Sequence, residues 1–416
     1  MRLSTTKPVA AWDFLAAAWT FELRDWALHL TLTCLTAVFA AALFISLELL
    51  LTGNQPHQFG DFYALWSSGE LAQSGAPALN YDADSLHLHQ VALGMNPDRY
   101  NPFPYPPAFL LLLALLGRLS LRTAFALFMV ATFALYLLAM AGGRDWRWLV
   151  AACLAPASTV VWMSGQSGFL SGALMVGGLR LAPTRPVLAG ILFGLLCYKP
   201  QLGVLLPIAL VAAGSWRAIA AAAATVAICA LASSEAFGWE IWPAWFASIV
   251  EYAGRFDPVV QFMPTIYANA LMLGFSAPVA LAAQSLAAVA IAVPIWRAFR
   301  EGFTPRAGAV LIAGTFLATP HAFNYDMPML MAPIYWYFSR RYRASLSVSV
   351  GEALILTLAL ILPFAMVTLR NIGIPVSWAP ELLLFYLIAR PCPALDASSS
   401  CEAEPCKQAR ELAATS

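Results

Sequence analysis

The side chains in this sequence that are best suited to chemistry are a few ionisable groups at the ends of apolar segments. Asp61 stands in the run Gly60-Asp61-Phe62-Tyr63, shortly after the first apolar segment ends. An aspartate there can take a proton from a substrate hydroxyl as a general base. It can equally cap the helix predicted over residues 62–71, whose apolar face is expected to lie along the membrane surface. The spacing alone leaves both interpretations open.

The second candidate is an isolated lysine, Lys199, which lies between two short apolar runs and is followed by Pro200 and Gln201. Such a lysine can extend to phosphate headgroups in general, or it can bind the phosphate of one particular lipid. We favour the specific role because few strong bases are expected on the outer side of the membrane, where the break with Lys199 is expected to lie. Arg255 is the other candidate cation, and Gln201 is a candidate ligand.

The third candidate is a short break in which His321 and Asp326 flank the run Ala322-Phe323-Asn324-Tyr325. A histidine and a carboxylate at this spacing can orient each other or bind a sugar hydroxyl. The alternative is a capped helix start, and neither interpretation prevails on sequence alone.

Two groups of potential metal ligands have simpler explanations. Asp82, Asp84, His87 and His89 fall within eight residues, but Ser85 and the leucines after it are typical of a capped interfacial helix, which we favour. Four cysteines stand in apolar runs as small hydrophobic residues, and the three in the C-terminal tail match no zinc-ligand spacing. We therefore expect neither a cofactor nor a metal site.

The composition places all of these candidates in a membrane protein. Of 416 residues, 61% are hydrophobic and 11% are charged, with a net charge of +1, which excludes an ordinary soluble chain and gives no basis for nucleic-acid binding. At about 20 apolar residues per crossing, we expect an all-α polytopic protein with about 11 to 13 apolar segments. Nucleotide-binding and hydrolase motifs do not occur.

The chain divides into three parts. Residues 1–25 form an N-terminal segment without the features of a cleavable signal peptide, 26–390 a transmembrane domain, and 391–416 a polar tail expected to be disordered. Within the domain, the polar residues 53–106 must form a loop outside the membrane. The intervals 198–201, 234–276 and 320–326 are expected to complete a cavity with this loop.

Charge bias assigns the two sides of the membrane. From residue 180 onward, alternate breaks and the tail hold 12 Lys and Arg, whereas the opposite breaks hold three. The richer set is expected in the cytoplasm, together with the N-terminal segment, so the 53–106 loop faces the periplasm of a bacterial inner membrane. The alternation fails before residue 180, because the break with Arg118 and Arg122 and the break with Arg180 and Arg185 are both expected in the cytoplasm, yet three apolar runs separate them. One of these runs is expected to be re-entrant.

A resemblance to a known family emerges from the order of the motifs. The aspartate after the first helix, the Tyr105-Pro106-Pro107 turn, Gly165-Gln166, Lys199-Pro200-Gln201 and Asn324-Tyr325-Asp326 are similar to glycosyltransferase family 87, within the GT-C class of membrane glycosyltransferases. This family includes mannosyltransferases that use polyprenyl-phosphate-mannose.

The resemblance implies that a hexose, mannose by the family pattern, passes from a polyprenyl-phosphate donor to a lipid or glycan hydroxyl with inversion. By this pattern Asp61 acts as the general base, His321 supports the donor or acceptor, and a cation neutralises the departing phosphate. The residues expected to bind substrate are Tyr105, Gln166, Lys199, Gln201, Arg255, Tyr325 and Asp326. The Asp-x-Asp or Glu-x-Asp metal signature of other GT-C enzymes does not follow the first helix, so metal dependence is not expected.

Two other classes of protein stay in consideration. Short apolar runs broken by proline also occur in secondary transporters and lipid flippases, whose sites form at discontinuous helices near the bilayer midplane. The polar groups here gather at one face, which favours the enzyme. A non-catalytic assembly subunit is the third possibility, and it would tolerate the loss of Asp61.

Overall fold

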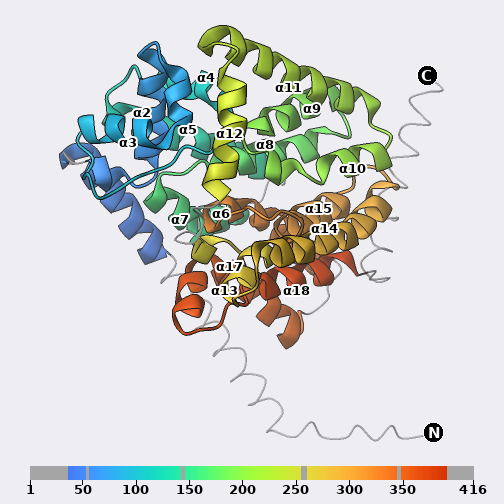
Figure 1. Ribbon diagram of the computed structural model, residues 1–416. Helices are drawn as coiled ribbons and strands as arrows, with labels where there is room; N and C mark the ends of the chain where they lie inside the picture. The colour runs from blue at the N-terminus through green and yellow to red at the C-terminus, as the bar shows by residue number, and fades with distance from the viewer. Residues whose placement is uncertain (1–35, 53–55, 142–145, 254–259, 344–347, 391–416) are drawn as a thin grey trace, which may run out of the picture.

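A computed structural model describes residues 36–52, 56–141, 146–253, 260–343 and 348–390, and throughout these residues the regular secondary structure is helical (Figure 1). The first described helix is Thr36–Thr52. The helices that follow in the first part of the chain are α2 (Phe62–Gln73), α3 (Ala83–Ala92), α4 (Pro107–Leu116), α5 (Leu121–Met140), α6 (Trp146–Leu154), α7 (Pro156–Ser164), α8 (Gly168–Leu181), α9 (Pro186–Leu195), α10 (Leu206–Ala212), α11 (Trp216–Phe237) and α12 (Ile241–Ala253).

The remaining α-helices are α13 (Ile266–Met272), α14 (Ala277–Phe299), α15 (Pro305–Ala318), α16 (Met331–Arg343), α17 (Val350–Asn371) and α18 (Trp378–Ala389). Short 3-10 helices connect several of them: η1 (Pro56–Phe59), η2 (Pro77–Tyr81), η3 (Leu196–Tyr198), η4 (Pro200–Gly203), η5 (Val260–Phe262) and η6 (Asn324–Leu330). Prolines at the first turns of α4, α7, α9 and α15 explain these starts, since their fixed φ suits that position.

Among the described residues, α5, α11 and α14 are by length and composition able to cross a membrane, with mean hydropathies of 2.1, 1.7 and 1.9. Eight further apolar helices are shorter, with 10–17 residues. The outer faces of the long helices carry exposed leucine and valine side chains, as expected of surfaces that contact lipid. The chain is therefore an all-helical membrane protein.

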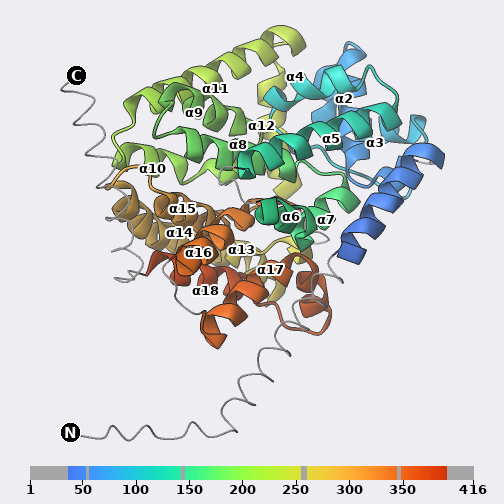
Figure 2. The same cartoon turned by 180° about the vertical axis from the view of Figure 1, so that it is seen from behind.

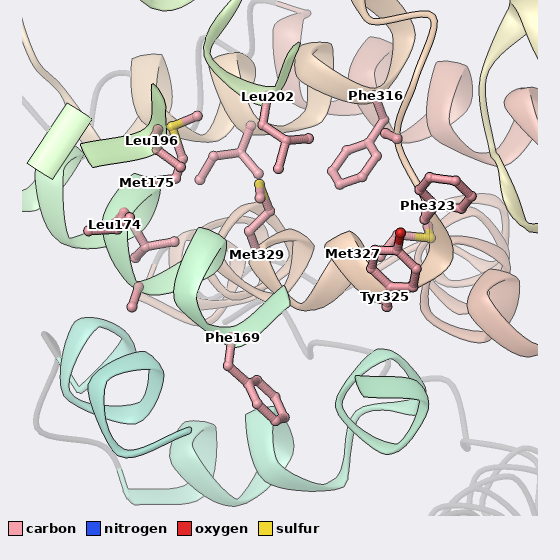
Figure 3. Packing of buried hydrophobic residues seen from close by; sticks show 14 of the residues in the cluster. Phe169, Leu174, Met175, Leu196, Leu202, Phe316, Phe323, Tyr325, Met327 and Met329 are labelled. Carbon is pink, nitrogen blue, oxygen red and sulfur yellow. The ribbon is translucent and has the colours of Figure 1, made fainter. Parts of the chain in front are cut away.

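The helices form two halves. In Figures 1 and 2 the helices up to α12 lie on one side of the molecule, and those after residue 260 lie on the other. The N-terminal end of α8 contacts η6 across this boundary. A side chain added at Gly168 would collide with the carbonyl oxygen of Tyr325, so only glycine permits this approach. Figure 3 shows the apolar side chains gathered around this contact, with Met329 of η6 near Met175 of α8.

Helix α2 is held inside the protein rather than along the membrane surface. Phe62 and Leu65 are fully buried, and the Phe62 ring packs on Phe125 and Phe128 of α5 at centroid distances of 5.4 and 5.5 Å. The apolar face that the sequence predicted to meet lipid is therefore covered by α4 and α5. This packing fixes the residue that precedes α2, Asp61, relative to the helical core.

Contacts along α5 and α8 show that these two helices run in the same direction. The Phe133 and Phe169 rings lie 4.8 Å apart, and the Arg180 guanidinium at the far end of α8 donates to the carbonyl of Leu138 at 3.3 Å. If Arg180 is cytoplasmic, as its charge predicts, the end of α5 is cytoplasmic and its start at Leu121 is on the outer side.

The same orientation places the Arg118–Arg122 break on the outer side, although its charges alone predict the cytoplasmic side. Arg122 donates to the carbonyl of Leu51, at the end of the first helix, at 3.5 Å, and Arg118 donates to Gln73 of α2 at 3.4 Å. Both arginines thus lie beside the outer loop. If α4, whose 10 residues span only about 15 Å, does not cross the membrane, the alternation of the two sides is restored.

Candidate active site

A cavity of about 1180 Å³ lies between the two halves of the molecule. Its lining combines residues of the outer loop, the break between α9 and α10, helix α12 and the segment before η6. The site residues predicted from the sequence that line it are Asp61, Tyr105, Gln166, Lys199, Gln201, His321, Tyr325 and Asp326. Residues up to 265 positions apart in the chain thus meet in one place.

The carboxylate of Asp61 does not cap α2. Asp61 occupies the N-cap position, but its side chain makes no capping hydrogen bond. Its Oδ2 instead accepts a hydrogen bond from Nε2 of Gln166 at 3.1 Å. The Tyr105 hydroxyl donates to Oε1 of the same Gln166 at 2.9 Å, which fixes the amide orientation. The side chain is therefore directed to the cavity by a dedicated chain of hydrogen bonds.

Two glycines bring Asp61 to this position. Gly60 and Gly165 both have left-handed φ angles, of 57° and 67°. A Cβ at Gly60 would lie 2.7 Å from the carbonyl oxygen of Ser164, and one at Gly165 would lie 2.7 Å from Cβ of Phe62. The backbone N–H of Asp61 donates to that Ser164 carbonyl at 2.8 Å. The turn before α2 is thereby attached to the turn before α8.

Asp61 is open to the cavity but surrounded by protein. Burial raises the pKa of its carboxyl above the ordinary value, because removal from bulk water disfavours the charged form. The hydrogen bond from Gln166 and the charge of Lys199 act in the opposite direction and favour the carboxylate. A carboxylate with a raised pKa is a stronger base, as proton abstraction requires.

Lys199 is isolated in the sequence, but in the structure it pairs with a carboxylate. Its Nζ lies 2.6 Å from Oδ1 of Asp326, and the two side chains are 2% and 1% exposed. The other oxygen of Asp326 accepts the backbone N–H of Phe323 at 3.2 Å, so this carboxylate also helps to begin η6. The ammonium group lies over the ring of Tyr325, 4.8 Å from its centroid. Lys199 therefore joins the α9–α10 break to η6.

His321 is expected to be uncharged at neutral pH. Burial and the nearby charge of Lys199 lower the pKa of its imidazole to about 4. Its ring packs edge-on against Phe323 at 4.9 Å, and its backbone N–H donates to the Thr319 hydroxyl at 3.3 Å. A neutral imidazole can donate a hydrogen bond to a substrate hydroxyl or accept one from it, but it cannot neutralise the charge of a phosphate.

An aromatic pair in the cavity wall joins Tyr325, which the sequence predicted as a site residue, to Phe323, which it did not. The rings of Phe323 and Tyr325 stack at 4.9 Å with an interplanar angle of 16°, and both line the cavity (Figure 3). Trp245 of α12 also lines it and donates from its indole N–H to the carbonyl of Pro104 at 3.1 Å. Aromatic side chains stand at every second residue from His321 to Tyr325. This alternation is the signal that was available in the sequence.

The potential metal ligands at residues 82–89 do not add to this site. Arg255 lies outside the described residues. Asp82 caps α3 by accepting the N–H of Ser85 at 2.8 Å, and His89 pairs with Glu70 at 2.7 Å. Across the described ranges, no three His, Cys, Asp or Glu side chains gather as metal ligands do. The motif at residues 82–89 is thus a capped helix, as the simpler interpretation held.

An all-helical membrane protein with a cavity of this size, and with an aspartate held at the cavity wall by a hydrogen bond, suits a membrane enzyme. Residues 103–320 match glycosyltransferase family 87, and this match covers more than half of the chain. The chain belongs to glycosyltransferase family 87. No curated protein and no solved structure matches it. Asp61, His321, Tyr325 and Asp326 lie outside the matched residues, so their place in the cavity is an independent observation.

Proposed function

We propose that the protein transfers a hexose, mannose by the family pattern, from a polyprenyl-phosphate sugar to a hydroxyl of a lipid or glycan acceptor at the periplasmic face of a bacterial inner membrane. The observation that carries this proposal is the Asp61 carboxylate, which leaves its own helix uncapped and is held at the cavity wall by Gln166. A carboxylate in this arrangement is suited to act as a general base.

The lining and the volume of the cavity are suited to two substrates that each have polar and apolar parts. Asp61, His321 and the Lys199–Asp326 pair provide a polar region, whereas Ile249, Phe262, Leu281 and Phe364 contribute apolar wall. A volume of about 1180 Å³ exceeds what one sugar requires. The stacked rings of Phe323 and Tyr325 offer a flat apolar face, on which one face of a hexose ring can rest.

The proposed reaction is a single displacement. Asp61 accepts the proton of the acceptor hydroxyl, and the oxygen forms a bond to the anomeric carbon of the sugar. The bond from that carbon to the phosphate oxygen breaks, and the polyprenyl phosphate leaves with the electron pair from the opposite face, which inverts the configuration. Lys199 is the only Lys or Arg among the described residues that line the cavity, so it or Arg255 neutralises the phosphate.

The proposal is tested with purified protein in liposomes that contain a polyprenyl-phosphate hexose labelled in the sugar, together with candidate lipid or glycan acceptors. We expect label to move to the acceptor, also in the presence of EDTA, since a protein cation stabilises the leaving group. If the intact labelled lipid changes leaflet while no sugar is transferred, the protein is a flippase and the proposal is wrong.

A further inference from the structure

Two cysteines outside the proposed reaction lie against each other near the site. Cys197 is in η3, directly before Tyr198 and Lys199, and Cys229 is in α11. Their thiol groups lie close enough to interact with each other, and both residues are free and only partly buried. Cysteines in apolar helices are ordinarily small packing residues, but two that meet across a helix interface can do more.

The helices that carry these cysteines approach each other unusually closely. A side chain at Gly190 of α9 would collide with the carbonyl oxygen of Ala218 in α11. A Cβ at Gly194 would lie 2.6 Å from Cβ of Thr225. The two backbones are therefore in direct contact along a seam of small residues, as in tightly packed membrane helix pairs.

The cysteines continue this seam. Gly190 meets Ala218, Gly194 meets Thr225 and Cys197 meets Cys229, so contact positions rise together along both segments and the helices run in the same direction. A disulfide requires Cα atoms about 4.4–6.8 Å apart and Cβ atoms about 3.5–4.5 Å apart. The glycines hold the two backbones close, so a small movement of η3 toward α11 is enough to bring the cysteines into this range.

We propose that Cys197 and Cys229 form a redox modification site, in which an intramolecular disulfide ties the lysine-bearing break to α11. The two thiols lose two protons and two electrons and form one S–S bond. The electrons pass to a disulfide oxidant, a protein or small-molecule disulfide that is itself reduced to two thiols by exchange. The outer face of a bacterial membrane, where this break is proposed to lie, is a compartment in which disulfides persist.

The disulfide acts on the site through the residues that follow Cys197; this part rests on the proposed function. The Tyr198 hydroxyl is held by Ser171 at 2.7 Å, and Lys199 is held by Asp326 at 2.6 Å. Closing an S–S bond of about 2.05 Å draws η3 toward α11 and strains these contacts. The oxidised protein is therefore the less active form, and reduction restores it.

The bond itself is tested without any activity measurement. Full-length protein in membranes is treated with oxidised glutathione or with copper–phenanthroline and digested with trypsin under non-reducing conditions. Cleavage after Arg217, an exposed residue between the two cysteines, separates them, so only a disulfide keeps their peptides joined. We expect the joined peptides in the wild type and in Cys153→Ser, and their loss in Cys197→Ser and Cys229→Ser. Their absence from the wild type with both oxidants would overturn the modification site.

The link to the site is tested by sugar transfer with the same samples. Oxidation is expected to lower the transfer rate about tenfold in the wild type, as small displacements in a site do, with recovery in dithiothreitol. Cys229→Ser is expected to keep its basal activity and to be insensitive to the oxidant. A disulfide that leaves transfer unchanged would overturn the coupling to Lys199. If no sample transfers sugar while the joined peptides form, the proposed function fails and the modification site stands.

Discussion

The hydrogen-bond chain from Tyr105 through Gln166 to Asp61 is the central feature at the scale of residues. A glutamine amide has one acceptor and one donor side, and here Tyr105 occupies the acceptor so that the donor must face the carboxylate. The chain therefore both orients Asp61 and moderates the effect of burial on its pKa.

Removal of the Gln166 amide is expected to shift the pH dependence of catalysis. The Asp61 base works only as a carboxylate, so the rate falls with decreasing pH as the pKa is crossed. The hydrogen bond from Gln166 lowers that pKa, and Gln166→Leu removes it. We therefore expect the acid limb of the kcat profile to move to higher pH. Gln73→Leu, which changes a glutamine bonded to the Ala114 carbonyl, serves as the control. An unmoved acid limb would contradict the assignment.

Variants of the buried pair of Lys199 and Asp326 can distinguish the contribution of Lys199 to stability from its contribution to the reaction. Lys199→Met leaves a buried carboxylate unpaired and is expected to lower the free energy of unfolding by about 3–5 kcal/mol. The double variant Lys199→Met, Asp326→Leu should recover part of this stability, because neither charge is then left alone. Thermal unfolding in detergent measures the effect. If Lys199 neutralises the phosphate, the double variant should still fail to transfer sugar, whereas transfer by it would assign this role to Arg255.

The residues of the site were predictable individually, but their pairing was not. Asp61, Lys199 and His321 stand out in the sequence because ionisable groups are rare in this chain and costly near lipid. The partner of Lys199 lies 127 residues further along the chain, and the spacing of residues in a motif cannot identify so distant a partner. For the same reason the sequence left open whether Asp61 caps its helix, since the alternative partner belongs to another element.

At the scale of elements, the attachment of the turn before α2 to the turn before α8 decides where Asp61 lies. Gly60→Ala is expected to lower both stability and transfer, because the added methyl group meets the Ser164 carbonyl in a left-handed backbone. Gly75→Ala is a matched control, since Gly75 also has a left-handed φ, of 84°, but nothing lies within 4 Å of the added group.

Both glycine variants are expected to lose about 1–2 kcal/mol of stability through backbone strain. Only Gly60→Ala should lose more than this, together with most of its transfer rate, and unfolding curves compared with transfer rates will show it. Equal losses in the two variants would mean that the contact with Ser164 does not position Asp61.

At this scale, the sequence could not show which of the short apolar helices cross the membrane. The run at α4 is as apolar as the crossing helices, and its 10 residues did not distinguish it from other short runs. What identifies it is contact: Gly69 of α2 packs directly on its backbone, with the added Cβ 2.6 Å from the carbonyl carbon of Leu113. Such backbone contacts between helices leave no periodic trace in a single sequence.

At the scale of the whole molecule, the position of the break between α4 and α5 can be tested by labelling. Ser120 lies in this break and Thr184 in the break between α8 and α9, and both are exposed. Ser120→Cys is expected to react with a membrane-impermeant maleimide added to the outside of spheroplasts. Thr184→Cys should react only after the membrane is opened, and the parent protein gives the background. The opposite pattern would reverse the topology proposed for the first half of the chain.

The proposed reaction depends most directly on Asp61. The measurement is the rate of transfer of labelled hexose from the polyprenyl-phosphate donor in liposomes by Asp61→Asn, compared with the wild type. Asn keeps the size and the contact with Gln166 but cannot accept the proton, so we predict a fall of about 10²–10⁴-fold with unchanged thermal unfolding. Asp82→Asn, at the cap of α3, should keep the wild-type rate. Wild-type transfer by Asp61→Asn would contradict the account.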